Sequence, residues 1–307
     1  MKKEIKNISA SIRAKLFSIS KSGNIDFDSL LLRYFQERFL FRLSLSEYKN
    51  NFVLKGGLLL LSWDIPETRL TIDIDFLATR IKNNPEIILT AFKKMAEMQM
   101  TDGVVFDSTS ITHEYIQDDS DYSGLRFKIL AHLGQAKKKI RIDIGFGDII
   151  TPSSTTVDMP TILNDENPKL KAYSIESVIS EKLEAMVKHS VLNSRMKDFY
   201  DIYIISKDRM IKGEILSQAI INTFKSRKSE ITENIVAFSP QFYQDSIKHK
   251  QWSAFLNKAQ LKDFNKTFPQ VIEHIRYFLN PIIHGIVKRN VVNAVWDNEK
   301  ASWKKEA

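Results

Sequence analysis

A glycine pair and two closely spaced aspartates are the residues of this chain best suited to chemistry. Gly56 and Gly57 follow Lys55, and the tripeptide Asp73-Ile74-Asp75 begins sixteen residues after the second glycine. Glycine lets the backbone come close to a phosphate group, and carboxylate oxygens bind divalent metal ions. Either motif alone is common, and a glycine pair also marks ordinary tight turns. Their order and spacing together predict a pocket for a nucleoside triphosphate.

The segment 70–77 alternates between apolar and polar residues, which predicts a β-strand. Because side chains alternate across a strand, Asp73 and Asp75 should share one face with Thr71. Two carboxylates in that arrangement repel each other unless a cation lies between them. The alternative is the exposed polar face of an edge strand. The apolar side chains of the other face, which we expect to be buried, are Ile72, Ile74 and Phe76.

A second predicted strand, over residues 138–146, repeats this pattern. Arg141 and Asp143 share its polar face, and the apolar face carries Ile140, Ile142 and Ile144. If the two strands are neighbours, Asp143 joins Asp73 and Asp75. Three carboxylates can hold two Mg²⁺ or Mn²⁺ ions about 3.5–4 Å apart, the spacing used for in-line phosphoryl chemistry. Asp143 would then also help to accept the proton of an attacking hydroxyl, unless it is an ordinary surface aspartate.

The glycine pair is expected to lead into a helix, whose first backbone N–H groups and positive dipole end suit phosphate oxygens. Lys55 would add positive charge there. Arg69, just before the aspartate strand, would either contact phosphate or cap the strand. The chain lacks the GxxxxGK[ST] and GxGxxG fingerprints, which disfavours a P-loop enzyme or a Rossmann oxidoreductase.

Lys182 lies on or beside the apolar stripe of a helix that we expect over residues 174–190. A buried ammonium group is costly without an anionic partner. A nucleotide phosphate is one candidate partner. Asp198 or Asp201 of the next predicted helix is another, and either could instead orient an acceptor hydroxyl or form an ordinary helix ion pair. The remaining alternative is a lysine whose side chain runs out to solvent.

The composition limits the kinds of protein that this chain can be. The chain has 307 residues, 43% of them hydrophobic, which suits a globular protein of about two domains. Its net charge of +8 fits a polyanionic partner, although solubility alone also explains it. No apolar run reaches the roughly 20 residues needed to span a bilayer, and no signal peptide is evident, so we expect a cytoplasmic protein. The absence of cysteine excludes disulfides, cysteine zinc sites and thiol nucleophiles.

The succession of predicted elements indicates an α+β fold, with a mixed sheet and its helices followed by a helical C-terminal part. We expect residues 1–50 to pack on the core as helices, 51–170 to form the domain with the glycine and aspartate motifs, and 171–307 to form a helical domain. Prolines make 151–170 the expected boundary, and the tail after Asp297 should be frayed. The other predicted elements are strands over 52–54, 109–116 and 125–133 and helices over 4–20, 28–45, 58–63, 85–98, 195–208, 213–226, 241–262 and 268–285.

Basic residues cluster at 137–141 and again along the C-terminal half, where aromatic residues are interleaved with them. Such aromatics can stack on nucleic-acid bases. The other interpretation is a helical core surrounded by solvated lysines. The residues concerned are Lys225, Arg227, Lys228, Lys248, Lys250, Lys258, Lys262 and Lys266, with Phe242, Tyr243, Trp252, Phe255 and Phe264.

Several stretches together resemble the AbiEii family, the nucleotidyltransferase toxins of abortive-infection and type IV toxin–antitoxin systems, which includes the mycobacterial MenT toxins. The resemblance extends over nearly the whole chain and is strongest over 5–80 and 174–205. It implies a DNA polymerase β-type nucleotidyltransferase core with a helical C-terminal part. The stretches that carry it are residues 7–11, 33–40, 52–57, 69–76 and 197–201.

The resemblance also implies roles for individual residues. The second glycine position often holds serine or alanine in the family, and Gly57 keeps the close backbone approach without a hydroxyl. Some relatives are inhibited by phosphorylation of a serine two residues before the first aspartate, where this chain has Thr71. The implied site comprises Gly56 and Gly57 for the nucleotide, Asp73 and Asp75 for metal, and Lys182 and Asp198 to complete the active site.

Relatives in this family transfer nucleotides to the 3′ acceptor end of tRNA and block aminoacylation, AbiEii itself is associated with GTP, and the partner is a cognate AbiEi-type antitoxin that acts directly or indirectly. We therefore expect a monomeric, Mg²⁺- or Mn²⁺-dependent toxin of phage defence. It would move a nucleoside monophosphate from GTP, CTP or UTP to an RNA 3′ hydroxyl. The alternatives are transfer to a protein hydroxyl and a non-catalytic module that binds GTP or RNA.

Overall fold

The computed structural model describes residues 7–66, 68–116, 124–290 and 292–305, and the chain divides into two compact units. Unit 1 consists of residues 1–62, 71–147 and 156–172, and unit 2 of residues 63–70, 148–155 and 173–307. The N-terminal helices thus belong to the same unit as the main sheet. The two short stretches 63–70 and 148–155 belong to the largely helical unit 2.

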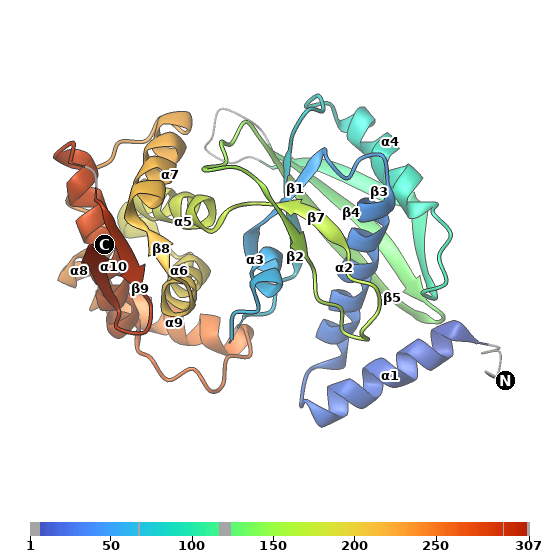
Figure 1. Ribbon diagram of the computed structural model, residues 1–307. Coiled ribbons are helices and arrows are strands. Elements are labelled where there is room, and N and C mark those ends of the chain that lie inside the picture. Colours follow the sequence, from blue (N-terminus) through green and yellow to red (C-terminus); the bar gives the residue numbers. More distant parts are fainter. Residues whose placement is uncertain (1–6, 67, 117–123, 291, 306–307) are drawn as a thin grey trace. The chain divides into compact units, whose positions relative to one another are not determined.

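Unit 1 is built on a seven-stranded sheet with the order β3-β4-β5-β2-β1-β7-β6 (Figure 1). The sheet is mixed, because β2 runs parallel to β5 and antiparallel to β1. β6 and β7 lie in the stretch where the sequence indicated only a boundary. The strands are β1 (Phe52–Lys55), β2 (Asp73–Ala78), β3 (Val104–Ile116), β4 (Gly124–Leu133), β5 (Ala136–Phe146), β6 (Thr155–Asp158) and β7 (Lys169–Ala172).

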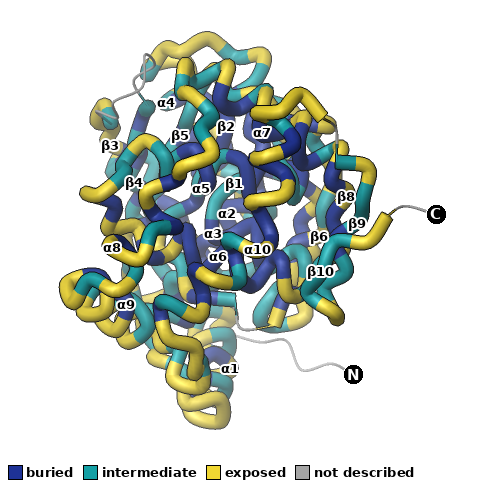
Figure 2. Tube along the Cα trace, turned by 90° about the vertical axis from the view of Figure 1, so that its left-hand side faces the viewer, coloured by how far each residue is buried: buried dark blue, intermediate teal, exposed yellow. Residues whose placement is uncertain are grey.

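The helices of unit 1 are α1 (Ile8–Ser22), α2 (Phe27–Leu45), the one-turn α3 (Gly56–Leu59) and α4 (Pro85–Ala96). α2 and α4 pack on the apolar face of the sheet, and α1 is mostly exposed (Figure 2). Phe92 of α4 lies at the centre of this layer, with its ring centroid 5.6, 5.4 and 5.0 Å from those of Phe39, Phe52 and Phe127. Because this face is fully packed, the polar side chains of β2, β4 and β5 point to the other face.

Unit 2 combines helices with a small sheet of order β10-β9-β8. The predicted helix over 241–262 is in fact two helices, because Asp245 caps a new one by accepting the N–H groups of Ile247 and Lys248. The elements are α5 (Ile175–His189), α6 (Met196–Asp208), α7 (Gly213–Ser226), α8 (Pro240–Tyr243), α9 (Ser246–Lys258) and α10 (Phe268–Val287), with β8 (Ile211–Lys212), β9 (Ala294–Asp297) and β10 (Ser302–Lys305).

The expectation of a frayed tail after Asp297 was wrong. β10 pairs with β9, and Trp303 stacks on Phe278 at 5.7 Å with nearly parallel rings. The indole of Trp303 also donates to the carbonyl of Phe278 over 2.9 Å. Two tryptophans, Trp296 and Trp303, anchor this hairpin, since burying such large side chains offsets the entropy of ordering a chain end.

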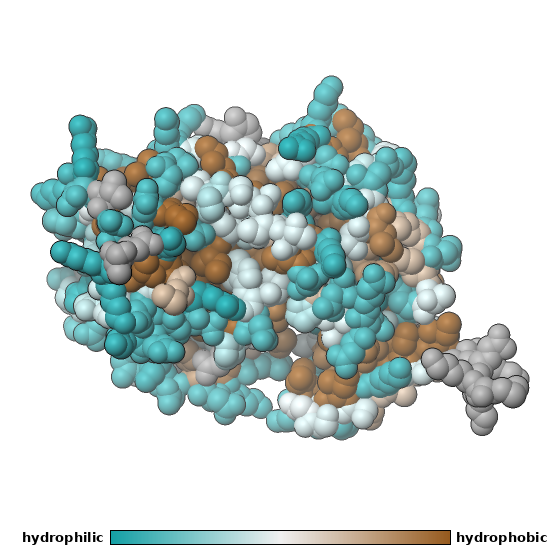
Figure 3. Space-filling view, viewed as in Figure 1, coloured by the Kyte–Doolittle hydropathy of each residue, from teal (hydrophilic) through white to brown (hydrophobic). Residues whose placement is uncertain are grey.

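The α+β class predicted from the sequence is confirmed: a mixed sheet with helices is followed by a helical part. The face shown in Figure 3 is mostly hydrophilic, with hydrophobic residues scattered among polar ones. Among the described residues, no helix is long and apolar enough to cross a membrane.

Candidate active site

Gly56 brings the turn after β1 directly against Asp75. β1 and β2 are antiparallel, and Lys55 is the register partner of Asp75. The φ angle of Gly56 is +70°, a conformation that glycine adopts at little cost and other residues rarely adopt. A Cβ atom on Gly56 would lie 2.1 Å from Asp75 Oδ2. The glycine motif and the aspartate motif therefore meet in unit 1, and no side chain other than hydrogen fits between them.

We expect Gly56→Ala to disturb Asp75 as well as the turn. The positive φ alone costs about 1–2 kcal/mol for a residue with a Cβ atom, and the clash displaces the carboxylate. Gly134→Ala is a matched control, since Gly134 also has a positive φ but its Cβ would meet only Ser9 at 3.5 Å. Urea denaturation should show a similar strain cost at both positions. Only Gly56→Ala should also lower the rate of the nucleotidyl transfer that the sequence leads us to expect. Equal rates in the two variants would contradict a role for the contact between Gly56 and Asp75.

The polar face of β2 and β5 carries three carboxylates. The two strands are parallel neighbours, with Asp75 opposite Asp143 and Asp73 opposite Arg141. On the other face, the predicted burial of Ile74, Phe76, Ile140, Ile142 and Ile144 is confirmed. The two strands are thus neighbours with their isoleucines on one side, which is the condition under which Asp143 joins Asp73 and Asp75.

Two of these carboxylates are paired with arginines of the same sheet. Arg126 of β4 is the register partner of Asp143 and donates to both of its oxygens, from Nε over 2.8 Å and from Nη2 over 2.6 Å. Arg141 donates from Nε to Asp73. The hydrogen bonds to Asp143 raise the pKa of the Arg126 guanidinium, so its charge is permanent. The face therefore carries both anions and cations on three neighbouring strands.

Oxygen donors of this kind suit Mg²⁺ or Mn²⁺. In the part of the chain that the structure describes, no group of three or more His, Asp or Glu side chains is arranged to hold a metal ion. Asp73 and Asp143 are turned to arginines instead. The chemistry of the three carboxylates fits a divalent cation, and binding it would require them to exchange partners. The metal-binding role of Asp73, Asp75 and Asp143 stays a prediction.

Two local features differ from the sequence-based expectations. β2 begins at Asp73, so Ile72 precedes the strand and is 49% exposed instead of buried. The side-chain amide of Gln36 donates to the Ile72 carbonyl over 2.9 Å, in place of a strand partner. Thr71 also precedes β2, and its hydroxyl lies 3.5 Å from the Asp73 carbonyl. The glycines do not precede a helix but form the first two residues of α3, which has only four residues. Its dipole is therefore small, and phosphate binding there would depend on backbone N–H groups.

Unit 2 contains a buried charge cluster around Lys182. The Lys182 ammonium donates to Asp198 over 2.9 Å and to Asp201 over 2.6 Å. Arg69 donates to both oxygens of Asp201, over 2.8 and 2.9 Å, and Arg195 donates to Asp198 over 2.6 Å. Asp201 is fully buried, and Lys182, Asp198 and Arg69 are nearly so. Of the partners that the sequence left open for Lys182, the structure shows the two aspartates, and it shows Arg69 bound to Asp201 instead of capping a strand.

The charges of this cluster stabilise one another. Burial alone would raise the pKa of Asp198 and Asp201, but the neighbouring cations outweigh burial and hold both pKa values below the usual range. Burial alone would lower the pKa of Lys182, yet the negative charges of Asp198 and Asp201 raise it. Both aspartates and the lysine are therefore ionised in the folded protein at neutral pH.

These shifts predict how stability depends on pH. The aspartate pKa values are lowered from 3.8, so their contribution is present above about pH 4 and is lost as pH falls further. The lysine pKa is raised from 10.5, so its contribution is present below that pH and is lost as pH rises above it. Urea unfolding midpoints over a pH series should show an acid limb that Asp198→Asn flattens. An unchanged acid limb in Asp198→Asn would contradict the assignment.

Most of the aromatic residues that the sequence singled out in the C-terminal half pack in the core of unit 2. Phe242 and Trp252 are buried, and Trp252 contacts Phe255 and Phe264 at 5.5 and 6.0 Å between ring centroids. Lys248 is buried too, and it donates to the carbonyls of Val191 and Asn193 over 3.0 and 2.7 Å. The core interpretation is confirmed for these residues.

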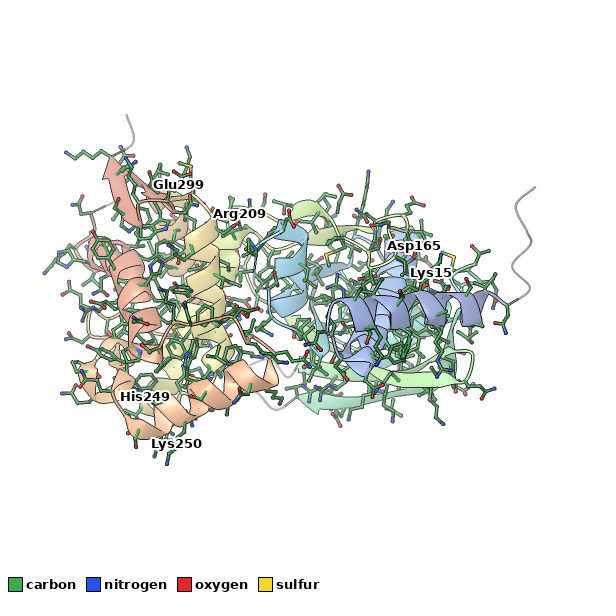
Figure 4. The ribbon with its side chains drawn as sticks, turned by 90° about the horizontal axis from the view of Figure 1, so that it is seen from below. Lys15, Asp165, Arg209, His249, Lys250 and Glu299 are labelled. Atoms are coloured by element: carbon green, nitrogen blue, oxygen red, sulfur yellow. The ribbon has the colours of Figure 1, made fainter. Side chains whose placement is uncertain are left out.

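The outer side of α9 is different. His249 and Lys250 are exposed on α9 (Figure 4), and the His249 ring lies 2.9 Å from the Tyr243 carbonyl. The basic cluster predicted around positions 248 and 250 is therefore divided between a structural lysine and a surface one.

Sequence reasoning missed Arg126, which binds Asp143 at the candidate site. The signal was present in the hairpin between β4 and β5, whose turn at Gly134 pairs Leu133 with Ala136. Counting back along both strands from that pair sets Arg126 opposite Asp143. The alternation of the predicted strand over 125–133 also places Arg126 on the polar face, opposite buried Leu125 and Phe127.

Comparison with known proteins gives a family and two solved structures. The family model described as "Nucleotidyl transferase AbiEii toxin, Type IV TA system" matches residues 38–274, a range that contains every predicted site residue. A crystal structure of a candidate nucleotidyltransferase from H. pylori is 14% identical and covers 85% of this chain and 96% of that chain, with a TM-score of 0.46. JHP933 from Helicobacter pylori is 14% identical and covers 83% and 97%, with a TM-score of 0.42. No curated protein matches the chain.

Proposed function

The chain belongs to the AbiEii family of nucleotidyl transferase toxins of type IV toxin–antitoxin systems, and we propose that it moves a nucleoside monophosphate from a nucleoside triphosphate to the 3′ hydroxyl of an RNA, with tRNA as the acceptor. The protein is a nucleotidyltransferase enzyme, and its family implies an antitoxin partner. Loss of a usable 3′ end would block aminoacylation and hence translation.

The observation that carries the proposal is the contact between Gly56 and Asp75 on a face shared with Asp73 and Asp143. Backbone N–H groups of the glycine turn would donate to phosphate oxygens, and Lys55 would add charge. Asp73 and Asp75 would hold a divalent cation. Mg²⁺ or Mn²⁺ bound there would supply positive charge to the phosphates and lower the pKa of the attacking hydroxyl.

Asp143 would act as the proton acceptor in this reaction. As the 3′ oxygen of the RNA attacks the α-phosphorus, its proton passes to an Asp143 carboxylate oxygen. A new bond forms between the 3′ oxygen and the α-phosphorus. The bond from the α-phosphorus to the oxygen bridging to the β-phosphate breaks, and pyrophosphate leaves with that electron pair.

Lys182 and Asp198 enter the proposal through their charge cluster. Among the described residues, the cluster contains three cations, Arg69, Lys182 and Arg195, and the two carboxylates of Asp198 and Asp201. These five side chains together carry a charge of +1. A net positive charge suits a polyphosphate. We propose that this cluster, in which Asp198 and Asp201 hold Lys182 and Asp201 holds Arg69, gives unit 2 a positive field that attracts polyphosphate.

The test is transfer of label from each of the four [α-³²P]NTPs, one at a time, to total tRNA by the purified protein. The proposal predicts labelled tRNA with one or two of the nucleotides and no labelled protein band. Label in a protein band would indicate transfer to a protein hydroxyl instead. Nucleotide binding without release of pyrophosphate would indicate a non-catalytic module, and either result would contradict the proposal.

A further inference from the structure

Two arginines bind Asp73 and Asp143, two of the carboxylates that a divalent cation would use. We propose that Arg141 and Arg126 compete with a divalent cation for these carboxylates, and that a nucleoside triphosphate relieves the competition by accepting the guanidinium groups on its phosphate oxygens. This inference rests on the proposed function and adds two residues that position the site for its nucleotide.

Strand register makes the two pairs part of one continuous face. Asp73 is opposite Arg141, and Asp143 is opposite Asp75 on one side and opposite Arg126 on the other. The backbone of β2, β5 and β4 therefore fixes three carboxylates and two guanidinium groups next to each other. A cation that binds Asp73 or Asp143 must share the carboxylate with an arginine or displace it.

The pairs are exposed enough to exchange. The side chains of Arg141 and Asp73 are 36% and 27% exposed, and those of Arg126 and Asp143 are 28% and 18% exposed. Ion pairs that water reaches contribute little to stability, so a doubly charged ion can replace a guanidinium. The buried pairs of Lys182 and Arg69 with Asp201 have no such exposure and are expected to be permanent.

A displaced arginine needs a new anion, and a triphosphate provides one. Guanidinium groups bind phosphate through paired N–H donors, as Arg126 does with the Asp143 carboxylate over 2.8 and 2.6 Å. The same side chains would thus hold the carboxylates before the nucleotide arrives and hold its phosphates afterwards. The cation and the nucleotide would bind with positive coupling. The nucleotide accepts the arginines that the cation must displace, and the cation releases the arginines that the nucleotide binds.

The experiment measures Mn²⁺ binding by the full chain, from the electron paramagnetic resonance signal of free Mn²⁺. We expect Arg141→Gln and Arg126→Gln to bind Mn²⁺ alone about three- to tenfold more tightly than the wild type, the change expected for losing one exposed competing pair. Arg141→Lys should give an intermediate value, since it keeps the charge but loses N–H donors. Thermal unfolding of each variant checks that the fold is intact.

Lys128→Gln is the matched control, because it removes one positive charge from the same strand as Arg126. Lys128 pairs with Glu114 over 2.9 Å and with neither Asp73 nor Asp143. Its effect on Mn²⁺ affinity should be clearly smaller than that of either arginine variant. An equal effect would mean that net charge alone controls the affinity, and the inference would be overturned.

A second titration adds a non-hydrolysable GTP analogue. The analogue should tighten Mn²⁺ binding in the wild type about tenfold more than in the Arg126→Gln, Arg141→Gln double variant. Mn²⁺ affinity that is unchanged or weaker in the arginine variants overturns the inference alone, provided that Asp73→Asn weakens binding. If Asp73→Asn and Asp75→Asn bind Mn²⁺ like the wild type, the metal site of the proposed function fails, and the inference fails with it.

Discussion

We expect Asp75→Asn to abolish nucleotidyl transfer while leaving the fold intact. Asparagine keeps the size of the side chain but removes the charge that the proposed metal ion needs. Losing several kcal/mol of transition-state stabilisation corresponds to a rate reduction of about 10³-fold. Asp75 is only partly buried, so the free energy of unfolding should change by no more than about 1 kcal/mol. The measurement is the initial rate of label transfer to tRNA, with urea denaturation alongside it.

Asp158→Asn is the control for Asp75→Asn. Asp158 lies on β6, an edge strand of the same sheet, and is exposed, and its replacement removes one negative charge by the same change of side chain. The rate of this variant should stay within about twofold of the wild type, as is usual for exposed positions. Comparable rates in Asp75→Asn and Asp158→Asn would remove Asp75 from the catalytic site.

The second large effect is expected in unit 2, where Lys182→Met should lower the free energy of unfolding by about 3–5 kcal/mol. Removing one partner of a buried ion pair leaves uncompensated charge in a medium of low dielectric constant. Asp201 has no exposed surface and Asp198 almost none, so water cannot replace the ammonium group. The measurement is the urea unfolding midpoint at neutral pH.

Two further variants separate this effect from general disruption of α5. Lys188→Met replaces an exposed lysine of the same helix and should change the free energy of unfolding by less than about 0.5 kcal/mol. In Lys182→Met combined with Asp198→Asn, the total loss should be smaller than the sum of the single losses, because the second change removes one of the stranded charges. Additive losses would mean that Lys182 and Asp198 do not act as a pair.

Local pattern was sufficient for the elements around the carboxylates of β2 and β5. Alternation identified β2 and β5 and the burial of Ile74 and Ile142, because a period of two depends only on neighbouring residues. Alternation failed for Ile72, whose carbonyl accepts a hydrogen bond from Gln36 of α2. The start of a strand depends on where its partners begin, and alternation contains no information about that.

Long-range pairs were beyond the reach of sequence reasoning. Arg69 and Asp201 are 132 residues apart in the chain, and nothing in either neighbourhood indicates that they meet. The helical stripe did show that Lys182 needs an anion, because burial of a charge is a local property of the pattern. Which anion satisfies it is decided by the packing of α5 against α6, and the choice between phosphate and aspartate had to come from the structure.

We propose transfer to an RNA 3′ hydroxyl at the carboxylates of β2. The most direct measurement of it compares label transfer from the preferred [α-³²P]NTP to intact tRNA and to tRNA whose 3′ hydroxyl has been removed by periodate oxidation. We predict that the wild type labels intact tRNA only and that Asp75→Asn labels neither. Equal labelling of oxidised and intact tRNA, or undiminished labelling by Asp75→Asn, would contradict the claim.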